Sequence, residues 1–287
     1  MSREVAPMSE AYGATIAKRG LARRLRDLRV AAGYTANQVC DRLNWGRGKV
    51  GRFEANNWVR PELSDIRDLA RIYEGSDLDE LEELATRARK RAWWRDYPDV
   101  FDNEFPGYEG DASSIRVVMP LVLPGLLQTL PYMQALLTSG TRTPEWREQA
   151  LRARLRRQQI LDRDDGTAPQ LTAILTEASL MYEWGDPGDR RAQLRHLLAM
   201  SARPNVEMRL LRFADGLHPG MSTLVNIFRF PCGEPSMVFL ENDADIQEID
   251  DPSRVEAYDE IFEQIRGAAL SPADTAKHLE KLIATLE

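Results

Sequence analysis

Residues 35–54 have the sequence Thr-Ala-Asn-Gln-Val-Cys-Asp-Arg-Leu-Asn-Trp-Gly-Arg-Gly-Lys-Val-Gly-Arg-Phe-Glu. In the first half of this stretch, Val39 and Leu43 are spaced to share the buried face of a short helix. Thr35 is a suitable N-cap for that helix, because its hydroxyl can accept a hydrogen bond from an unpaired backbone N–H. An Asn-Trp-Gly triplet then breaks the helix, and a second helix begins near Arg47. The stretch therefore predicts two short helices joined by a tight turn.

The second predicted helix carries three cations. Val50 and Phe53 are three residues apart, so both can anchor the helix to the protein interior. Arg47, Lys49 and Arg52 are then left mostly outward, near the first turns of the helix. This placement is typical of a recognition helix, whose N-terminal side chains meet base edges in the major groove. Arginine can donate two hydrogen bonds to guanine, whereas lysine more often meets phosphate.

Polar and basic residues follow this helix and extend the expected contact surface. Asn56 can end the helix in a left-handed conformation. Asn57 and Arg60 then lie where the chain could touch the sugar-phosphate backbone. The residues expected to contact double-stranded DNA are Thr35, Gln38, Arg47, Gly48, Lys49, Arg52, Asn56, Asn57 and Arg60. No catalytic, cofactor-binding or metal-binding residue is expected.

The glycines of the second helix match the spacing G-x-G-x-x-G at Gly46, Gly48 and Gly51. A dinucleotide site requires a strand before this motif and a helix after it, and here a short helix precedes it. Within a helix, Gly48 and Gly51 would each cost about 0.5–1 kcal/mol relative to alanine. Two explanations stay open, which are close approach of the backbone to DNA and a weakened DNA-reading helix.

Outward from this stretch, the charge of the chain is distributed unevenly. The 287 residues have a formal net charge of −7. Residues 1–60 contain twelve Lys and Arg against five Asp and Glu, which is +7, so the remainder carries −14. A local basic face suits phosphate, and an acidic remainder limits non-specific binding to DNA. The length favours two domains rather than one.

The chain is expected to be cytoplasmic and associated with the nucleoid. It has no apolar stretch of about 18 residues, so no membrane span is expected. Cys40 and Cys232 are far apart in unlike contexts, which argues against a disulfide framework or a zinc cluster and suits a reducing cytoplasm.

The second half of the chain has the pattern of an α+β domain. Strand patterns occur at 171–176, 206–213, 224–230 and 237–240, and helix patterns at 144–162, 190–200, 251–266 and 271–286. Three strands in succession with turn signals between them predict an antiparallel sheet. The expected organisation is a disordered lead at 1–17, an all-α helix-turn-helix domain at 18–75, a linker helix and connector at 76–111, and the α+β domain at 112–287.

Residues 35–54 resemble the lambda-repressor-like, XRE-type family of helix-turn-helix domains, which commonly has Ser-Gln-Ser-Lys-Ile-Ser-Arg-Ile-Glu in its third helix. Lys49, Val50, Arg52 and Glu54 match that pattern. Three glycines stand in place of the serines, and Arg47 replaces a glutamine that often reads bases. The resemblance therefore implies the fold more strongly than it implies any base preference.

A second resemblance covers the rest of the chain. The segments 122–129 (Val-Leu-Pro-Gly-Leu-Leu-Gln-Thr), 204–206 and 216–220, with the Trp93-Trp94 pair, are similar to the DUF5753 region found beside XRE-type domains in actinobacterial regulators. Several such proteins are described as Scr1-like, antitoxin-type regulators. Small DUF397-type proteins are often their genetic neighbours, and pairing with one is implied by the resemblance alone.

The leading hypothesis is a sequence-specific DNA-binding transcriptional regulator. A single helix-turn-helix unit contacts few bases, so a homodimer on half-sites roughly 34 Å apart is expected. The C-terminal domain would then supply the dimer surface, a partner surface or a pocket for a signal. The alternative is an antitoxin-like protein-interaction adaptor with weak DNA binding. An enzyme is not expected, nor is any cofactor.

Overall fold

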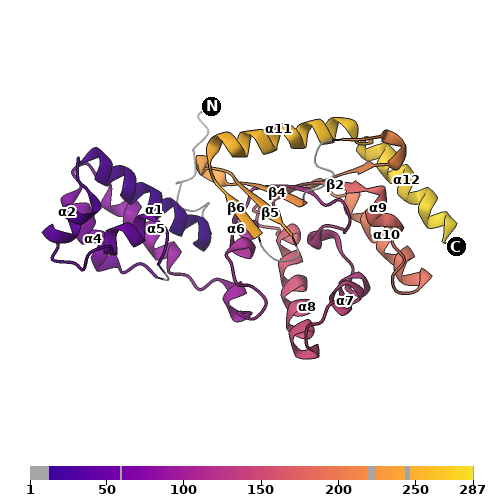
Figure 1. Cartoon of the computed structure of the whole chain (residues 1–287), viewed down its shortest axis with the longest axis horizontal. Helices are drawn as coiled ribbons and strands as arrows, with labels where there is room; N and C mark the ends of the chain where they lie inside the picture. The colour runs from indigo at the N-terminus through magenta and orange to yellow at the C-terminus, as the bar shows by residue number, and fades with distance from the viewer. Residues whose placement is uncertain (1–12, 59, 219–223, 243–245, 287) are drawn as a thin grey trace. The chain divides into compact units, whose positions relative to one another are not determined.

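The structure is a computed structural model that describes residues 13–58, 60–218, 224–242 and 246–286. The chain divides into two compact units, which are Met1–Asp96 with Pro231–Glu234, and Tyr97–Phe230 with Pro235–Glu287. Figure 1 traces the elements of both units along the chain. None of the helices in the described residues has the length and apolar character needed to cross a membrane.

The first unit is all-α, as the sequence predicts. Its described α-helices are α1 (Ala14–Ala31), α2 (Ala36–Arg42), α3 (Lys49–Glu54), α4 (Leu63–Ile72) and α5 (Leu78–Ala88) (Figure 1). Helix α3 packs against both α1 and α2, and α5 packs against both α1 and α4. Each helix contributes apolar side chains to the interior at helical spacing, among them Leu21, Val39, Val50, Ile66 and Leu81. The helix-turn-helix fold is confirmed.

The first unit is longer at both ends than the predicted domain. Helix α1 begins at Ala14, and Ile16 and Ala17 are fully buried, so the end of the expected lead at 1–17 is helical. Ala17 lies four residues before Leu21, which places it one turn back on the same apolar face. Residues 1–12 of the expected lead lie outside the described residues.

The helix expected to link the two domains belongs to the first unit. Its N-cap is Asp77, whose carboxylate accepts a hydrogen bond from the backbone N–H of Glu80 at 3.1 Å. It ends at Ala88, well before Trp94. Because its apolar face packs against α1 and α4, residues 78–88 complete the helical domain rather than forming a separate linker.

The described part of the second unit contains a six-stranded sheet in the order β3-β2-β1-β4-β5-β6. The strands are β1 (Ser114–Val118), β2 (Gln170–Thr176), β3 (Val206–Leu211), β4 (Leu224–Arg229), β5 (Met237–Glu241) and β6 (Ile246–Ile249). Strands β1, β2 and β3 are parallel, whereas β1, β4, β5 and β6 pair antiparallel. The predicted α+β fold is therefore confirmed, with a sheet that is mostly antiparallel but mixed, because β1, β2 and β3 pair in parallel. Helical connections separate the first three strands, and parallel pairing requires such crossovers.

The second unit contains all four of the helices predicted for it, together with others that were not predicted. Its described α-helices are α6 (Phe105–Asp111), α7 (Leu130–Thr138), α8 (Pro144–Gln158), α9 (Glu177–Met181), α10 (Pro187–Ser201), α11 (Pro252–Ala268) and α12 (Pro272–Thr285). The predictions for α8, α10, α11 and α12 are confirmed. Helix α6 was expected to be part of a connector, yet all but the last of its residues are buried.

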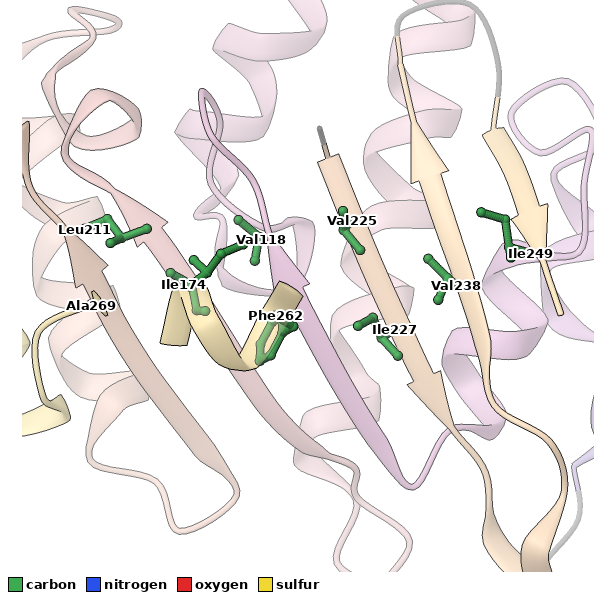
Figure 2. Close-up of a cluster of buried hydrophobic side chains, with 10 residues drawn as sticks. Val118, Ile174, Leu211, Val225, Ile227, Val238, Ile249, Phe262 and Ala269 are labelled. Atoms are coloured by element: carbon green, nitrogen blue, oxygen red, sulfur yellow. The ribbon is translucent and has the colours of Figure 1, made fainter. Parts of the chain in front are cut away.

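One face of the sheet forms a continuous apolar core under α11 (Figure 2). Every strand contributes to it, and the contributing strand residues are Val118, Ile174, Leu211, Val225, Ile227, Val238 and Ile249. Phe262 and Ile265 of α11 cover these side chains. The strand residues alternate with positions that point to the opposite face, as the pleat of a strand requires.

Helices α6, α7 and α8 lie on the opposite side of the sheet from α11 (Figure 1). There the ring centroid of Phe105 lies 5.2 Å from the ring centroids of both Phe228 and Phe239. Glu109 of the same helix is only 2% exposed, and its Oε2 lies 2.6 Å from Nε of Arg157. Burial raises the pKa of Glu109 to about 7, although the Arg157 guanidinium opposes this shift.

The Leu-Pro-Gly-Leu-Leu-Gln-Thr segment at 123–129 lies beside Arg157 of this pair and is held by hydrogen bonds. A Cβ at Gly125 would stand 2.5 Å from a terminal nitrogen of Arg157, so a side chain there would displace the guanidinium. Gln128 donates from its side chain to the Leu123 carbonyl at 2.7 Å, and Gln193 of α10 donates to the Leu127 carbonyl at 2.8 Å. The segment is therefore a fixed structural element of the second unit.

We expect Glu109 to make the stability of the protein depend on pH. Because its folded-state pKa of about 7 exceeds the ordinary value of 4.5, the folded chain holds this proton more tightly than the unfolded chain. This stabilisation is complete below the ordinary pKa and is lost as the pH rises through 7. Between about pH 5 and pH 8, the free energy of unfolding of the wild type should fall by on the order of 1–3 kcal/mol more than that of Glu109→Gln.

Urea unfolding of the full chain at the two pH values measures this difference. Glu109→Gln retains the shape of the side chain and removes the titration, so groups common to both chains cancel. Parallel pH profiles for the wild type and the variant would contradict the assignment.

Candidate nucleic-acid interface

The helix-turn-helix geometry is set by left-handed residues at the ends of three consecutive helices. Gly33, Asn44 and Asn56 have φ values of +73°, +52° and +56°, and they follow α1, α2 and α3 respectively. At the end of α3, the N–H of Asn57 donates to the carbonyl of Arg52 at 2.8 Å, and the N–H of Asn56 donates to the carbonyl of Phe53 at 3.0 Å. This pair of bonds is a Schellman motif, which occupies carbonyls that the helix leaves unpaired. The predicted left-handed role of Asn56 is confirmed.

Gly48 stands at the entrance to α3 rather than inside it. The residue is the N-cap of a helix that begins at Lys49, two residues later than expected, and its φ is +83°. Only glycine adopts this conformation without a steric penalty. Gly51 does lie inside the helix, and a Cβ added there would meet no atom within 4 Å. The two glycines therefore have different structural roles. Gly48 permits the turn before α3, and only Gly51 lowers the stability of the helix itself.

An ion pair fixes the C-terminal end of α3 to α1. The Arg29 guanidinium donates from Nε and from a terminal nitrogen to the two Glu54 oxygens, at 2.6 and 2.8 Å. The two side chains are only 14% and 9% exposed. Hydrogen bonding to Glu54 raises the pKa of Arg29 above its usual range. A bidentate pair of this kind fixes orientation as well as distance.

Aromatic side chains hold the turn between α2 and α3. The Phe53 ring centroid lies 4.3 Å from that of Trp58 and 6.0 Å from that of Trp45. The indole N–H of Trp58 donates to the Asn56 side-chain oxygen at 3.3 Å. No packing role was predicted for either tryptophan. Trp45 lies four residues before the first residue of α3 and Trp58 four residues after its last, and this spacing is the sequence feature that could have indicated that both pack against the helix.

Lys49 does not project freely outward, contrary to expectation. Its ammonium lies 2.7 Å from an oxygen of Asp65 in α4 and 3.9 Å from the centroid of the Trp45 ring. The Lys49 side chain is 27% exposed. A cation held by a carboxylate and an aromatic face joins the turn to α4 and is partly neutralised there.

Arg47, Arg52 and Arg60 are exposed, and none of them forms an ion pair with a residue that the structure describes. Several other arginines of the first unit are paired. Arg67 lies 2.6 Å from Glu82, and Arg89 lies 2.9 Å from Glu62. Three exposed arginines without an ion-pair partner among the described residues therefore lie just before α3, within it and just after it.

The remaining predicted residues lie at the two edges of this region. Thr35 and Gln38 form a capping box at the start of α2, in which the Gln38 N–H donates to the Thr35 hydroxyl at 3.3 Å and the Thr35 N–H donates to the Gln38 side chain at 2.8 Å. Both residues are exposed, and so is Asn57 after α3. The structure thus gathers the predicted set at the start of α2 and along residues 47–60.

The exposed arginines, the tight turn and the two packed helices define a helix-turn-helix protein, a class that binds DNA. Comparison with family models agrees, because a helix-turn-helix domain model matches residues 20–84. A domain of unknown function, DUF5753, matches residues 103–281, and the chain belongs to that family. Both resemblances noted in the sequence are thereby confirmed. Comparisons with curated proteins and with solved structures found no match.

The motifs that carried the second resemblance fall at different places in the second unit. The segment 122–129 lies between β1 and α7, where Gly125 leaves space for the guanidinium of Arg157. Residues 204–206 lead into β3. The last two residues of the segment 216–220 lie outside the described residues.

The Arg29–Glu54 pair should dominate the stability of the first unit. We expect Glu54→Ala to lower the free energy of unfolding by about 3 kcal/mol, because it leaves the Arg29 charge buried without a partner. Glu82→Ala is the matched control, since it breaks an ion pair with Arg67, whose side chain is 49% exposed, and should cost far less than Glu54→Ala because solvent screens that pair. Urea unfolding followed by tryptophan fluorescence measures both. Equal losses in the two variants would refute the assignment.

The two glycines should respond in opposite directions to alanine. Gly48→Ala should destabilise the protein by about 1 kcal/mol, because alanine is strained at a φ of +83°. Gly51→Ala should stabilise it by about 0.5–1 kcal/mol, because the position is helical and open. Thermal or urea unfolding tests this contrast. If both substitutions change the free energy of unfolding in the same direction, the assignment is wrong. Unchanged DNA affinity in Gly51→Ala would exclude close approach of the backbone to DNA at that residue.

Proposed function

We propose that the protein is a sequence-specific DNA-binding transcriptional regulator. The observation that carries this proposal is the pair Arg47 and Arg52, exposed and without an ion-pair partner among the described residues, at the start of α3 and within it. Arg52 stands on a helix that is held at both ends, and Arg47 lies two residues before that helix, so the backbone fixes where both side chains begin. Fixed, unpaired cations beside a groove-sized helix are what direct recognition of base edges requires.

The contacts divide into base reading and positioning. Arg47 is the residue for guanine, because it precedes the first turn of α3 and its guanidinium can donate two hydrogen bonds to one base. Asn57 and Arg60 follow α3 and suit the phosphate backbone, as do Thr35 and Gln38 at the start of α2. These backbone contacts fix register and carry no sequence information.

Lys49 has a different role in this proposal from that of the arginines. Its ammonium already interacts with Asp65 and Trp45, so contact with phosphate requires exchange of one anion for another. We therefore assign Lys49 to positioning α3 relative to α4.

A homodimer is part of the proposal, because one helix-turn-helix unit contacts too few bases for strong selectivity. Two helix-turn-helix domains, one from each chain of the dimer, on half-sites roughly 34 Å apart would double the number of base contacts. The second unit would supply the dimer surface, a surface for a partner such as a small DUF397-type protein, or a site for a signal. We propose that the protein acts in the cytoplasm on the nucleoid and has no enzymatic activity.

Replacing Arg47 tests the assignment of base reading. Selection of the full chain against a pool of random DNA duplexes identifies a preferred site, and anisotropy titration then measures affinity. Arg47→Ala should weaken binding to that site by about 1–3 kcal/mol and relax the preference at one base position. Arg71→Ala is the control, because Arg71 is an equally exposed arginine near the end of α4, paired with Asp68. If Arg47→Ala leaves site and affinity unchanged, Arg47 does not read bases.

A second candidate is an antitoxin-like adaptor that binds DNA weakly and acts through protein contacts. Two observations favour it, which are a six-residue α3 containing Gly51 and the partial neutralisation of Lys49 by Asp65. The dependence of affinity on salt separates the candidates, since the slope of log affinity against log salt is about −0.9 for each phosphate neutralised. A shallow slope together with no preferred site would support the adaptor.

A further inference from the structure

The second unit contains an open cavity of about 330 Å³ on the face of α7 that lies toward residues 182–184. Its walls come from three segments of the chain, which are residues 121–122, helix α7 with Ser139 at its end, and the side chains of Tyr182 and Trp184. The volume lies at the lower end of the range for small-molecule sites, about 300–1,000 Å³.

Two aromatic rings form part of the cavity wall. The rings of Tyr132 and Trp184 meet edge to face, with centroids 4.9 Å apart and planes at 81°. Tyr132 is only 7% exposed, and its hydroxyl oxygen accepts a hydrogen bond from the backbone N–H of Leu123 at 3.1 Å. The two rings therefore have a fixed mutual angle, and an edge of a third ring could pack against them in the same way.

The lining is mostly apolar and carries no charge, and Ser139 adds a hydroxyl group to it. Leu121, Val122, Ala135 and Leu136 contribute aliphatic surface, and none of the described residues that line the cavity is Asp, Glu, Lys or Arg. Burial raises the pKa of Tyr132, so this phenol is neutral at ordinary pH. A charged ligand would lose its hydration here without gaining an opposite charge, whereas a neutral apolar one would not.

Exposed apolar side chains lie in the cavity wall, at Leu121 and Tyr182, and next to it in the chain, at Met181. Leu121, Met181 and Tyr182 are 57%, 60% and 56% exposed. A single exposed apolar residue is ordinary, but a group beside a cavity marks a site where burial can be gained. Tyr182 and Trp184 also line a smaller cavity of about 210 Å³ next to Met181, so these aromatic side chains have open space on two sides.

The cavity adjoins a segment that several side-chain hydrogen bonds hold in place. Residues 121–122 directly precede the segment 123–129, which hydrogen bonds from Gln128 and Gln193 hold in place. Tyr132 adds the bond to Leu123 described above. A wall fixed in this way is formed before a ligand arrives, which reduces the ordering that binding requires.

We infer that this cavity binds a neutral aromatic small molecule of one or two rings, stacked edge to face against Tyr132 and Trp184. The inference gives a ligand class to the signal site that the proposed function allows in the second unit. It rests on the proposed function only for its regulatory meaning, since the binding itself requires no DNA.

Titration of the full chain with 2-naphthol tests the inference. This probe is neutral, has two fused aromatic rings and carries no substituent other than one hydroxyl group. Calorimetry or ligand-observed NMR should show saturable binding with a Kd on the order of 1 mM or tighter. The matched anion, 2-naphthoate, should bind at least about tenfold more weakly, because the lining offers no cation.

Two single substitutions in α7 locate the site. Ala135→Leu places a larger side chain in the cavity and should weaken 2-naphthol binding at least about tenfold, because it removes the space for a ring. Gln134→Leu adds the same side chain to the next residue, which is exposed and does not line the cavity, and should leave binding unchanged. Tyr182→Ala alters an exposed side chain at the opening, so it should weaken binding without unfolding the protein.

Several results would overturn the inference. These are absence of saturable 2-naphthol binding, equal binding of 2-naphthoate, or equal binding by Ala135→Leu. Concentration-dependent self-association that Ala135→Leu abolishes, with no binding of 2-naphthol, would identify the surface as a contact between copies instead. Arg47→Ala should bind 2-naphthol normally, so failure of DNA recognition and failure of this site are separate outcomes.

Discussion

The first unit depends on one buried ion pair, between Arg29 of α1 and Glu54 of α3. Helix α3 has only six residues, too few to be stable without tertiary contacts. The bidentate pair fixes its end, while Val50 and Phe53 fix its face. With the helix fixed in this way, Arg47 and Arg52 have a defined orientation, and the proposed reading of bases depends on that orientation.

Local chemistry made much of the helix-turn-helix region predictable. The cap at Thr35, the left-handed Asn56 and the inward Val50 and Phe53 all follow from neighbours within four residues in the sequence. Lys49 was not predictable in the same way, because its partner Asp65 lies in another helix. The outward side of a short helix is known from its own spacing, but ion pairs to other helices are known only from the packed structure.

The sheet of the second unit shows the same limit. Alternation and β-branched residues located most strands, but strand direction depends on how the connections cross the sheet. Strand β1 was missed because prolines dominate the segment that follows it, and α6 was missed because its aromatic residues are buried against the sheet rather than periodic. The cavity beside Trp184 combines three separate segments, so no local pattern marked it.

The position of β1 in the sheet has a consequence for synthesis of the protein. This strand lies in the middle of the sheet, yet its neighbours arrive much later, since Ser114 pairs with Gln170 on one side and with Arg229 on the other. Pairings so distant along the chain fold slowly, because a long loop must close before they form. On the ribosome, the helical unit can fold early, while the sheet must wait until nearly the whole polypeptide has emerged.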